Sequence, residues 1–380
     1  MTDVYLIRHC EAEGNLYRRA QGAYNGGISP LGELQLESLA ERFRSVPLDA
    51  IYASDLDRAV LTAGAAGKYH PALTVRQDRR LRELDMGEWE DLPWGNIQKY
   101  HADMLDAFNN RPAEWKIAGA ETFGALLARV REAVLEIAAR HDGQTVAIAS
   151  HGMALRTLQW DLLQRLGQTQ SPGHGDNTCV TLLHVEGGRV EIEYINDTSH
   201  LPQEQSTFFR QKWWKHEGKG EPNNLRIEPL PLPEDGPLFE RCYADAWRSI
   251  HGDLRGYTPD AYVAEAVRHA SIAPDTAVVQ AFRGEEFAGV IDLDTARYAQ
   301  EGIGWISLLY LTEPLRGKGL GVQLLGHAVS VYRRLGRSVI RLYVSTENPR
   351  AIRFYEKYRF RMLCRTEGAV APLLLMELRL

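Results

Sequence analysis

The stretch Val4-Tyr5-Leu6-Ile7-Arg8-His9 joins a short apolar run directly to two basic side chains. The run from Val4 to Ile7 has the length and apolar character of a buried β-strand. Arg8 and His9 follow it at once. Because ligands of open α/β sheets bind outside the carboxyl ends of the strands, we expect this arginine and histidine at a ligand site.

The same pattern recurs further along the first half of the chain. Apolar runs end before Ser54 and before Ser150-His151-Gly152. Amphipathic stretches that begin at Ser29-Pro30 and at Thr122 predict helices between the strands. This alternation predicts an α/β fold with three layers, in which helices cover both faces of a mostly parallel sheet. The predicted strands are 4–7, 50–53 and 146–149, and a closing hairpin is predicted at 180–185 and 190–195.

The bulk properties bound the class of protein. A chain of 380 residues is long enough for two domains. The formal net charge of −6 argues against nucleic acid and against an anionic membrane as partners. The four cysteines are scattered without metal-binding spacing, which is typical of a reducing compartment, so we expect a cytoplasmic protein. No apolar stretch approaches the ~18 residues that a membrane span needs.

A second unit follows a polar, turn-rich segment. We place the first domain at 1–202, a linker at 203–224 and the second domain at 225–380. Phe209 and Trp213 lie four residues apart among basic side chains, a pattern that could indicate nucleic acid, but the acidic net charge favours a short docking helix. The second domain is predicted to be α+β with a mixed sheet. Its expected strands are 277–282, 287–293, 303–311, 339–344 and 372–378, and a helix is expected at 349–358.

The first half resembles the histidine phosphatase superfamily, which has the phosphoglycerate-mutase-like fold. The resemblance covers about residues 1 to 200, and its pieces occur in the order of the family. The matching pieces are Leu6-Ile7-Arg8-His9-Cys10-Glu11-Ala12, Asn15, Arg19-Ala20-Gln21-Gly22, Ser54-x-x-x-Arg58-Ala59-x-x-Thr62-Ala63, Glu83 with Gly87 and Trp89, Gly119-Ala120-Glu121-Thr122-Phe123 and Ser150-His151-Gly152.

This resemblance implies a phosphatase with His9 as nucleophile and Glu83 as the acid that protonates the leaving group. Arg8, Arg58 and His151 would bind the phosphate, with Asn15, Gln21 and Gly22 lining its pocket. A histidine must be neutral to attack phosphorus, and nearby Arg8, Arg58 and a charged His151 would lower its proton affinity. The same cations would offset the charge of the transferring phosphoryl group.

Other interpretations of these residues stay open. His151 could be a buried structural histidine, and Arg58 a surface charge at a helix start. A metal site at His9 and His151 lacks an acidic or histidine-rich partner set in the sequence, so we expect no metal.

Two details bear on the chemistry. Cys10 stands where the family has glycine, and we expect its side chain to narrow the pocket or to make it sensitive to thiol reagents. Glu83 precedes His151 by 68 residues. The mutases of the family carry longer insertions there, so the sequence favours a phosphatase.

The glycine-rich segment 309–321 lies between a predicted strand and a predicted helix. Such a loop lets backbone N–H groups approach a pyrophosphate, although a plain tight turn is the alternative. Together with Asn348-Pro349-Arg350-Ala351-Ile352-Arg353-Phe354-Tyr355, it resembles the GNAT acyltransferases over about residues 225 to 380. The resemblance implies acetyl-CoA as co-substrate. The residues expected to bind it are Leu311, Arg316, Gly317, Lys318, Gly319, Leu320, Gly321 and Asn348.

The resemblance also implies that Tyr355 protonates the departing thiolate, with a core aromatic as the alternative. Two departures from the family pattern stand out. Arg359 replaces the usual glycine, and residues 305–310 contain no carboxylate to act as base. Glu301, just before the strand, or a water relay would then act as the base.

The sequence therefore predicts a bifunctional enzyme that acts on a small phosphorylated metabolite and on an amine acceptor. Two alternatives remain. The second domain could sense acyl-CoA and regulate the phosphatase without catalysing a reaction, or the first domain could be a phosphoglycerate-type mutase. A homodimer is among the assemblies that we consider.

Overall fold

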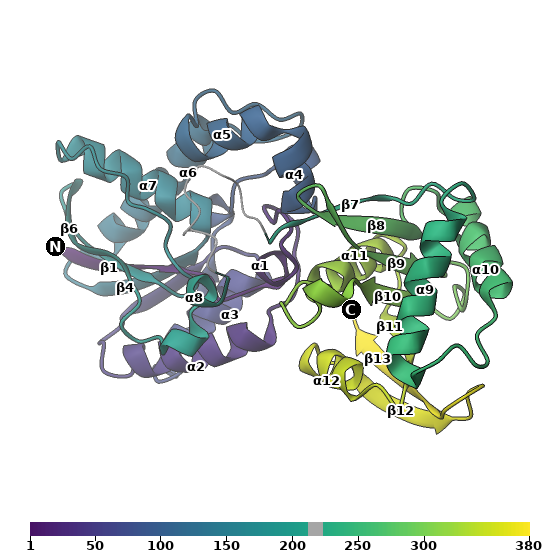
Figure 1. The fold of residues 1–380 in the computed structure, drawn as a ribbon. Helices are drawn as coiled ribbons and strands as arrows, with labels where there is room; N and C mark the ends of the chain where they lie inside the picture. Colours follow the sequence, from purple (N-terminus) through teal and green to yellow (C-terminus); the bar gives the residue numbers. More distant parts are fainter. Residues whose placement is uncertain (212–222) are drawn as a thin grey trace. The chain divides into compact units, whose positions relative to one another are not determined.

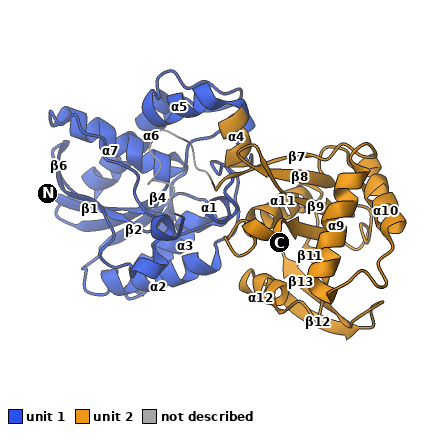
Figure 2. Ribbon diagram, in the orientation of Figure 1, with its two compact units in different colours: residues 1–92, 100–220 blue, residues 93–99, 221–380 orange. Residues whose placement is uncertain are grey.

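The computed structural model describes residues 1–211 and 223–380. Trp213, one of the two aromatic residues of the predicted docking helix, lies outside the described residues. The chain forms two compact units, coloured separately in Figure 2. The first contains residues 1–92 and 100–220, and the second contains residues 93–99 and 221–380. None of the described helices is long and apolar enough to cross a membrane.

The first unit is built on a six-stranded sheet with the order β3-β2-β4-β1-β5-β6. The four strands from β3 to β1 run parallel, whereas β5 and β6 form an antiparallel hairpin at the edge. Both glycines of the hairpin turn, Gly187 and Gly188, have positive φ, a conformation that costs glycine little. The strands are β1 Thr2–Arg8, β2 Ala50–Ala53, β3 Val75–Gln77, β4 Thr145–Ser150, β5 Val180–Glu186 and β6 Arg189–Asp197.

Helices pack against this sheet in two pairs (Figure 1). α2 (Pro30–Phe43) and α3 (Asp57–Ala66) form one pair, and α6 (Phe123–Arg140) and α7 (Gly152–Arg165) form the other. Both sequence-predicted caps are confirmed, since Ser29 accepts from the N–H of Gly32 and Thr122 from that of Ala125. The shorter elements are α1 Glu13–Tyr17, η1 Arg79–Leu81, η2 Gly87–Trp89, α5 Ala102–Asn110, η3 Gln203–Gln205 and α8 Thr207–Gln211.

The second unit has a seven-stranded mixed sheet with the order β12-β13-β11-β10-β9-β8-β7. Only the β10–β11 pair is parallel among its described strands, and that pairing stops after Ile306 and Leu342. The strands are β7 Leu225–Pro229, β8 Val278–Arg283, β9 Glu286–Leu293, β10 Ile303–Leu311, β11 Val339–Ser345, β12 Arg361–Thr366 and β13 Leu373–Arg379. The predicted mixed α+β fold is confirmed.

The core of the second unit lies between this sheet and two helices. Phe239 and Cys242 are buried with Leu308 and Tyr310 of β10. Elsewhere, Gly304 of β10 faces the ring of Tyr332, where any larger residue would collide with it. The helices are α4 Trp94–Tyr100, α9 Gly236–His251, α10 Pro259–Ile272, η5 Glu313–Leu315, α11 Gly321–Arg334 and α12 Pro349–Lys357.

Candidate active sites

The parallel register of β1 and β4 brings His9 and His151 together. Arg8 lies opposite Ser150, so both strands deliver their next residue to the same edge of the sheet. The backbone N–H of His9 donates to the carbonyl of Ser150 at 2.9 Å. The centroids of the two imidazole rings lie 5.1 Å apart, and both side chains are buried.

Two arginines are fixed beside these histidines by backbone carbonyls. Arg58 in the first turn of α3 is fully buried and donates to the carbonyls of Gly22 and Tyr24, at 2.7 and 3.1 Å. Arg8 donates through Nη1 to the carbonyl of Gly175. Because carbonyl oxygens are neutral, they orient the guanidinium groups and leave their positive charge available.

Several buried nitrogen atoms in these segments have no hydrogen-bond partner among the described residues. They are Arg8 Nε, Gln21 Nε2, Arg58 Nε, and Nδ1 and Nε2 of His151. A buried donor left unpaired costs about 1–3 kcal/mol, so such atoms are uncommon in folded proteins. A cluster of them around two guanidinium groups is suited to an anion with several acceptor oxygens.

The electrostatics of the site keep both histidines neutral. Burial, followed by the charges of Arg58 and Arg8, lowers the pKa of His9 well below its usual value. Burial and Arg58 likewise lower the pKa of His151, so the charged His151 expected from the sequence is wrong for the free protein. Nδ1 of His9 lies 2.7 Å from the carbonyl oxygen of Cys10 and therefore carries the proton. Its Nε2 keeps the lone pair that a nucleophile needs.

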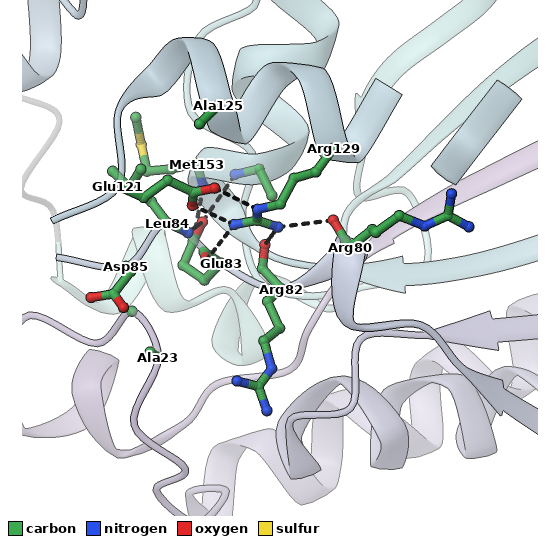
Figure 3. A network of polar contacts seen from close by, with 12 residues as sticks. Ala23, Arg80, Arg82, Glu83, Leu84, Asp85, Glu121, Ala125, Arg129 and Met153 are labelled. Carbon is green, nitrogen blue, oxygen red and sulfur yellow. Dashed lines mark hydrogen bonds and ion pairs between the residues drawn. The ribbon is translucent and has the colours of Figure 1, made fainter. Parts of the chain in front are cut away.

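Glu83 is held at the N-terminus of α7. Its Oε1 accepts from the N–H groups of Leu84 and Ala154 at 2.9 and 3.0 Å, and its Oε2 accepts from that of Met153 at 3.0 Å. Met153 and Ala154 lie in the first turn of α7, whose N–H groups have no partner within the helix. The carboxyl group is thus anchored on the helix that His151 precedes (Figure 3).

Cys10 does not behave as its position in the sequence suggests. Its side chain is fully buried, and burial raises the pKa of its thiol to about 12. Its Sγ atom would lie 3.5 Å from a Cβ at Gly32, so it packs against the start of α2. Burial and the raised pKa of its thiol argue against the expected sensitivity to thiol reagents, because the reactive form of cysteine is the exposed thiolate.

The three residues expected to line the pocket support its loops as well. Asn15 accepts from the N–H of Ala12, and Gln21 accepts through Oε1 from that of Gly14 while its Nε2 stays unpaired among the described residues. A Cβ on Gly22 would lie 2.2 Å from the carbonyl oxygen of Leu84, so only glycine fits there. Asn177, which sequence reasoning missed, donates to the carbonyl of His9 at 2.9 Å.

The end of the first unit also reaches this site. Gln211 donates through Nε2 to the carbonyl of Asn15 at 3.0 Å, and the guanidinium carbon of Arg8 lies 5.9 Å from the ring centroid of Phe208. Thr207 and Gln205 are tied to Gln35 of α2. Residues 203–211, which the sequence placed in a linker, thus pack in the first unit. In the sequence, this contact was indicated only by the clustered basic and aromatic residues that suggested a docking helix.

In the second unit, the glycine-rich loop joins β10 to α11. Gly317 and Gly319 have φ values of +78° and +79°, a conformation that favours glycine. The backbone N–H groups of 317–320 make no backbone hydrogen bond to another described residue, and that of Gly321 lies at the first position of α11, where the helix offers no partner. Lys318 is exposed and Leu320 is buried at the start of the helix. A row of free N–H groups at a helix N-terminus is suited to a phosphate group.

Arg316 serves the loop in a different way from that expected. Its Nε donates to the carbonyl of Leu311 at 2.8 Å, and its Nη2 pairs with Asp245 of α9. Tyr310 donates its hydroxyl to the same carboxylate at 2.9 Å. The side chain of Arg316 therefore fixes the loop to the end of β10, and the loop's backbone is the part that stays available to a ligand.

Asn348 directly precedes α12, and Tyr355 lies within it. Asn348 caps the helix by accepting from the N–H of Ala351 at 3.0 Å. Tyr355 is buried between Phe354 and Phe360, and burial raises its pKa, so its hydroxyl is protonated at neutral pH. A protonated phenol can donate to a leaving thiolate, but burial also fits the alternative of a core aromatic, so the role of Tyr355 stays a prediction.

A buried charged cluster in this unit was missed by the sequence analysis. His269 of α10 lies with Nδ1 at 2.7 Å from Asp292 and with Nε2 at 3.1 Å from Asp294. Although burial lowers it, the hydrogen bond to Asp292 raises the pKa of His269 overall. Neither this cluster nor any other group of three or more His, Cys, Asp or Glu side chains in the described chain is arranged to hold a metal ion.

Comparison with known families assigns both units. The model of the histidine phosphatase superfamily (branch 1) matches residues 4–198, which is just over half of the chain. The model of the acetyltransferase (GNAT) family matches residues 239–360.

Individual relatives match the first unit. Phosphoserine phosphatase 1 of Hydrogenobacter thermophilus is 30% identical over 202 residues, which are 53% of this chain and 95% of that protein. The metal-independent phosphoserine phosphatase of Arabidopsis thaliana is also 30% identical and is covered to 84%. A probable phosphoglycerate mutase GpmB of Enterobacter sp. is 33% identical over 42% of this chain and 73% of that protein.

Among solved structures, Bacillus stearothermophilus YhfR is 32% identical, with a TM-score of 0.49, over 53% of this chain and 99% of that one. The order of the motifs, the topology of the first sheet and the family matches all indicate the same family for the first unit. The chain belongs to the histidine phosphatase superfamily, branch 1, and carries a GNAT acetyltransferase domain that follows the phosphatase domain in the sequence.

Proposed function

We propose that the first domain is a phosphomonoesterase that acts on a small phosphorylated metabolite through a phosphohistidine at His9. The observation that carries this proposal is the set of unpaired buried nitrogens of Arg8, Arg58, Gln21 and His151 around a neutral imidazole. A phosphoryl group supplies acceptor oxygens for Arg8, Arg58 and Gln21 and for the one N–H that a neutral His151 carries, and planar guanidinium groups bind it with good geometry.

In the first half-reaction, the lone pair on His9 Nε2 attacks phosphorus and the bond to the leaving oxygen breaks. That oxygen takes a proton from the carboxylic acid form of Glu83. In the second, the Glu83 carboxylate takes a proton from water, whose oxygen attacks the phosphohistidine and releases inorganic phosphate. Arg8, Arg58 and His151 donate hydrogen bonds to the phosphoryl oxygens throughout.

Trapping the intermediate tests this mechanism. Rapid quenching should capture phosphate on His9, and His9→Ala should abolish phosphate release. The wild type should keep its activity in the presence of a chelator. Full activity of His9→Ala would contradict the proposal, and so would the loss of wild-type activity when a chelator is added. O-phosphoserine and 3-phosphoglycerate come first in the substrate screen, because relatives are named for phosphoserine hydrolysis and phosphoglycerate isomerisation. Isomer formation without net phosphate release would instead identify a mutase.

For the second domain, we propose acetyl-CoA-dependent N-acetyl transfer to an amine. The free N–H groups at 317–321 would bind the pyrophosphate, Leu311 and Asn348 would lie at either side, and Tyr355 would protonate the thiolate. Calorimetry with acetyl-CoA and an assay with a panel of amines test this role. If coenzyme A binds and changes only the phosphatase rate, with no acetylated amine formed, the domain is a sensor.

A further inference from the structure

The segment that carries Glu83 lacks regular secondary structure. Residues 82–86 lie between the short helices η1 and η2, and only the carbonyl of Met86 among them accepts from a helix N–H, that of Trp89 at 3.0 Å. The carboxyl group of Glu83 is anchored on α7, but that anchoring holds only the tip of the side chain. The backbone beneath it needs a separate support if the acid is to keep its position through two proton transfers.

Arg129 of α6 provides this support. Nη1 donates to the carbonyls of Arg80 and Arg82 at 2.8 and 2.7 Å, and Nη2 donates to the carbonyl of Glu83 at 2.9 Å. The remaining N–H groups of the guanidinium meet the two carboxylate oxygens of Glu121, at 2.7 Å for Nε and 2.6 Å for Nη2. Figure 3 shows these contacts converging on one guanidinium group, whose five donors are all used.

Glu121 completes the arrangement from the other side. Its own backbone N–H donates to the carbonyl of Asp85 at 3.0 Å, two residues beyond Glu83. Both charged side chains are about four-fifths buried, with 22% of Arg129 and 18% of Glu121 exposed. The pair therefore ties the whole segment from Arg80 to Asp85 to the start of α6, in a geometry that a lysine could not reproduce.

We propose that Arg129 and Glu121 form a positioning pair that sets the backbone of Glu83 for proton transfer to the leaving group. The inference rests on the proposed role of Glu83. Arg129 is a positioning residue, because its hydrogen bonds reach the backbone of Glu83 and its neighbours. Its charge also contributes to keeping the pKa of His151 low, after burial, Arg58 and His9.

Leaving-group dependence separates a positioning role from a merely structural one. An alkyl phosphate such as phosphoserine needs a proton on its departing oxygen, whereas p-nitrophenyl phosphate releases a phenolate that is stable without one. The ratio kcat/KM reports only the steps up to formation of the phosphohistidine, so it isolates the first half-reaction. Misplacing the acid should lower kcat/KM for the alkyl ester and spare it for the aryl ester.

We expect Arg129→Ala to reduce kcat/KM for the alkyl phosphate on the order of tenfold or more and that for p-nitrophenyl phosphate less than threefold. Glu121→Gln should lose a smaller factor with the same selectivity, and Arg129→Lys should restore part of the loss. Arg140→Ala is the matched control, since Arg140 lies on the same helix in an exposed pair with Glu136 and should change neither ratio.

The outcomes distinguish this inference from the function on which it rests. If Glu83→Gln shows no leaving-group dependence, the acid role of Glu83 is wrong. If Glu83→Gln shows it and folded Arg129→Ala and Glu121→Gln do not, the positioning role is overturned. Should Arg129→Ala fail to fold, Arg129→Lys and Glu121→Gln decide, and equal losses on both substrates from these two variants would count against the proposal.

Discussion

At the scale of single residues, environment decides which groups are reactive. His9 and Cys10 are neighbours in the sequence and both are buried, yet the first is set up as a nucleophile and the second as an inert packing residue. The motif identified His9 as the candidate nucleophile. It could not show that burial, more than a charged His151, keeps that nucleophile neutral, because burial comes from residues distant in sequence.

The two neutral histidines predict a loss of stability in mild acid. Burial lowers the pKa of both below the value of 6.5 that they have when unfolded. Below about pH 6.5 the unfolded chain therefore binds more protons, and stability falls as pH decreases from 7 to 5. Thermal melts across this range should show a smaller fall for His151→Asn than for wild type. An unchanged slope in that variant would mean that His151 titrates normally.

Thiol labelling checks the assignment of Cys10. Iodoacetamide at neutral pH should modify Cys364, which is exposed, and leave Cys10 unmodified. Phosphatase activity should survive the treatment, because no reactive thiolate lies beside His9. Cys364→Ser is the matched control and should lose the label that mass spectrometry maps to that residue. Inactivation together with a label on Cys10 would show that the pocket opens in solution.

At the scale of elements, periodicity predicted the strands that carry the sites. β10 at Ile303–Leu311 has the predicted bounds, and α2 and α6 begin at the predicted caps. β12 was missed, because five of its six residues are exposed and it shows no apolar pattern. The cluster of His269, Asp292 and Asp294 was missed because its members are brought together by tertiary packing alone.

The loop between β10 and α11 gives a prediction at this scale. Gly319→Ala should weaken acetyl-CoA binding severalfold, since a left-handed conformation costs a non-glycine residue roughly 1–2 kcal/mol and the loop would rearrange. Gly336→Ala is a matched control, because Gly336 also has a positive φ with no neighbour near its Cβ but follows the far end of α11. Calorimetry should show weaker binding for the first variant only, with phosphate release equal in both.

At the scale of the whole molecule, the chain crosses between its two units more often than the sequence suggested. Residues 93–99 leave the first unit, pack in the second and return. There the side chain of Asn96 exchanges two hydrogen bonds with the backbone of Ile227, at 2.7 and 2.8 Å, and Lys99 pairs with Glu285. The boundaries 1–202, 203–224 and 225–380 and the homodimer stay predictions.

We expect the two halves of the chain to work independently, although residues 93–99 of the first half pack in the second unit. A fragment ending at Asn223 keeps His9, Arg58, Glu83 and His151 and should retain phosphatase activity, as relatives consisting almost wholly of this domain suggest. It leaves Asn96 without Ile227, so the segment 93–99 should become sensitive to proteases. In the full chain, Asn96→Ala should lower the melting temperature of the second domain, because the Ile227 N–H loses its acceptor. Its phosphatase kcat should match that of wild type. A folded fragment without phosphatase activity would show that the acetyltransferase domain completes or controls the phosphatase site, and independence would be wrong.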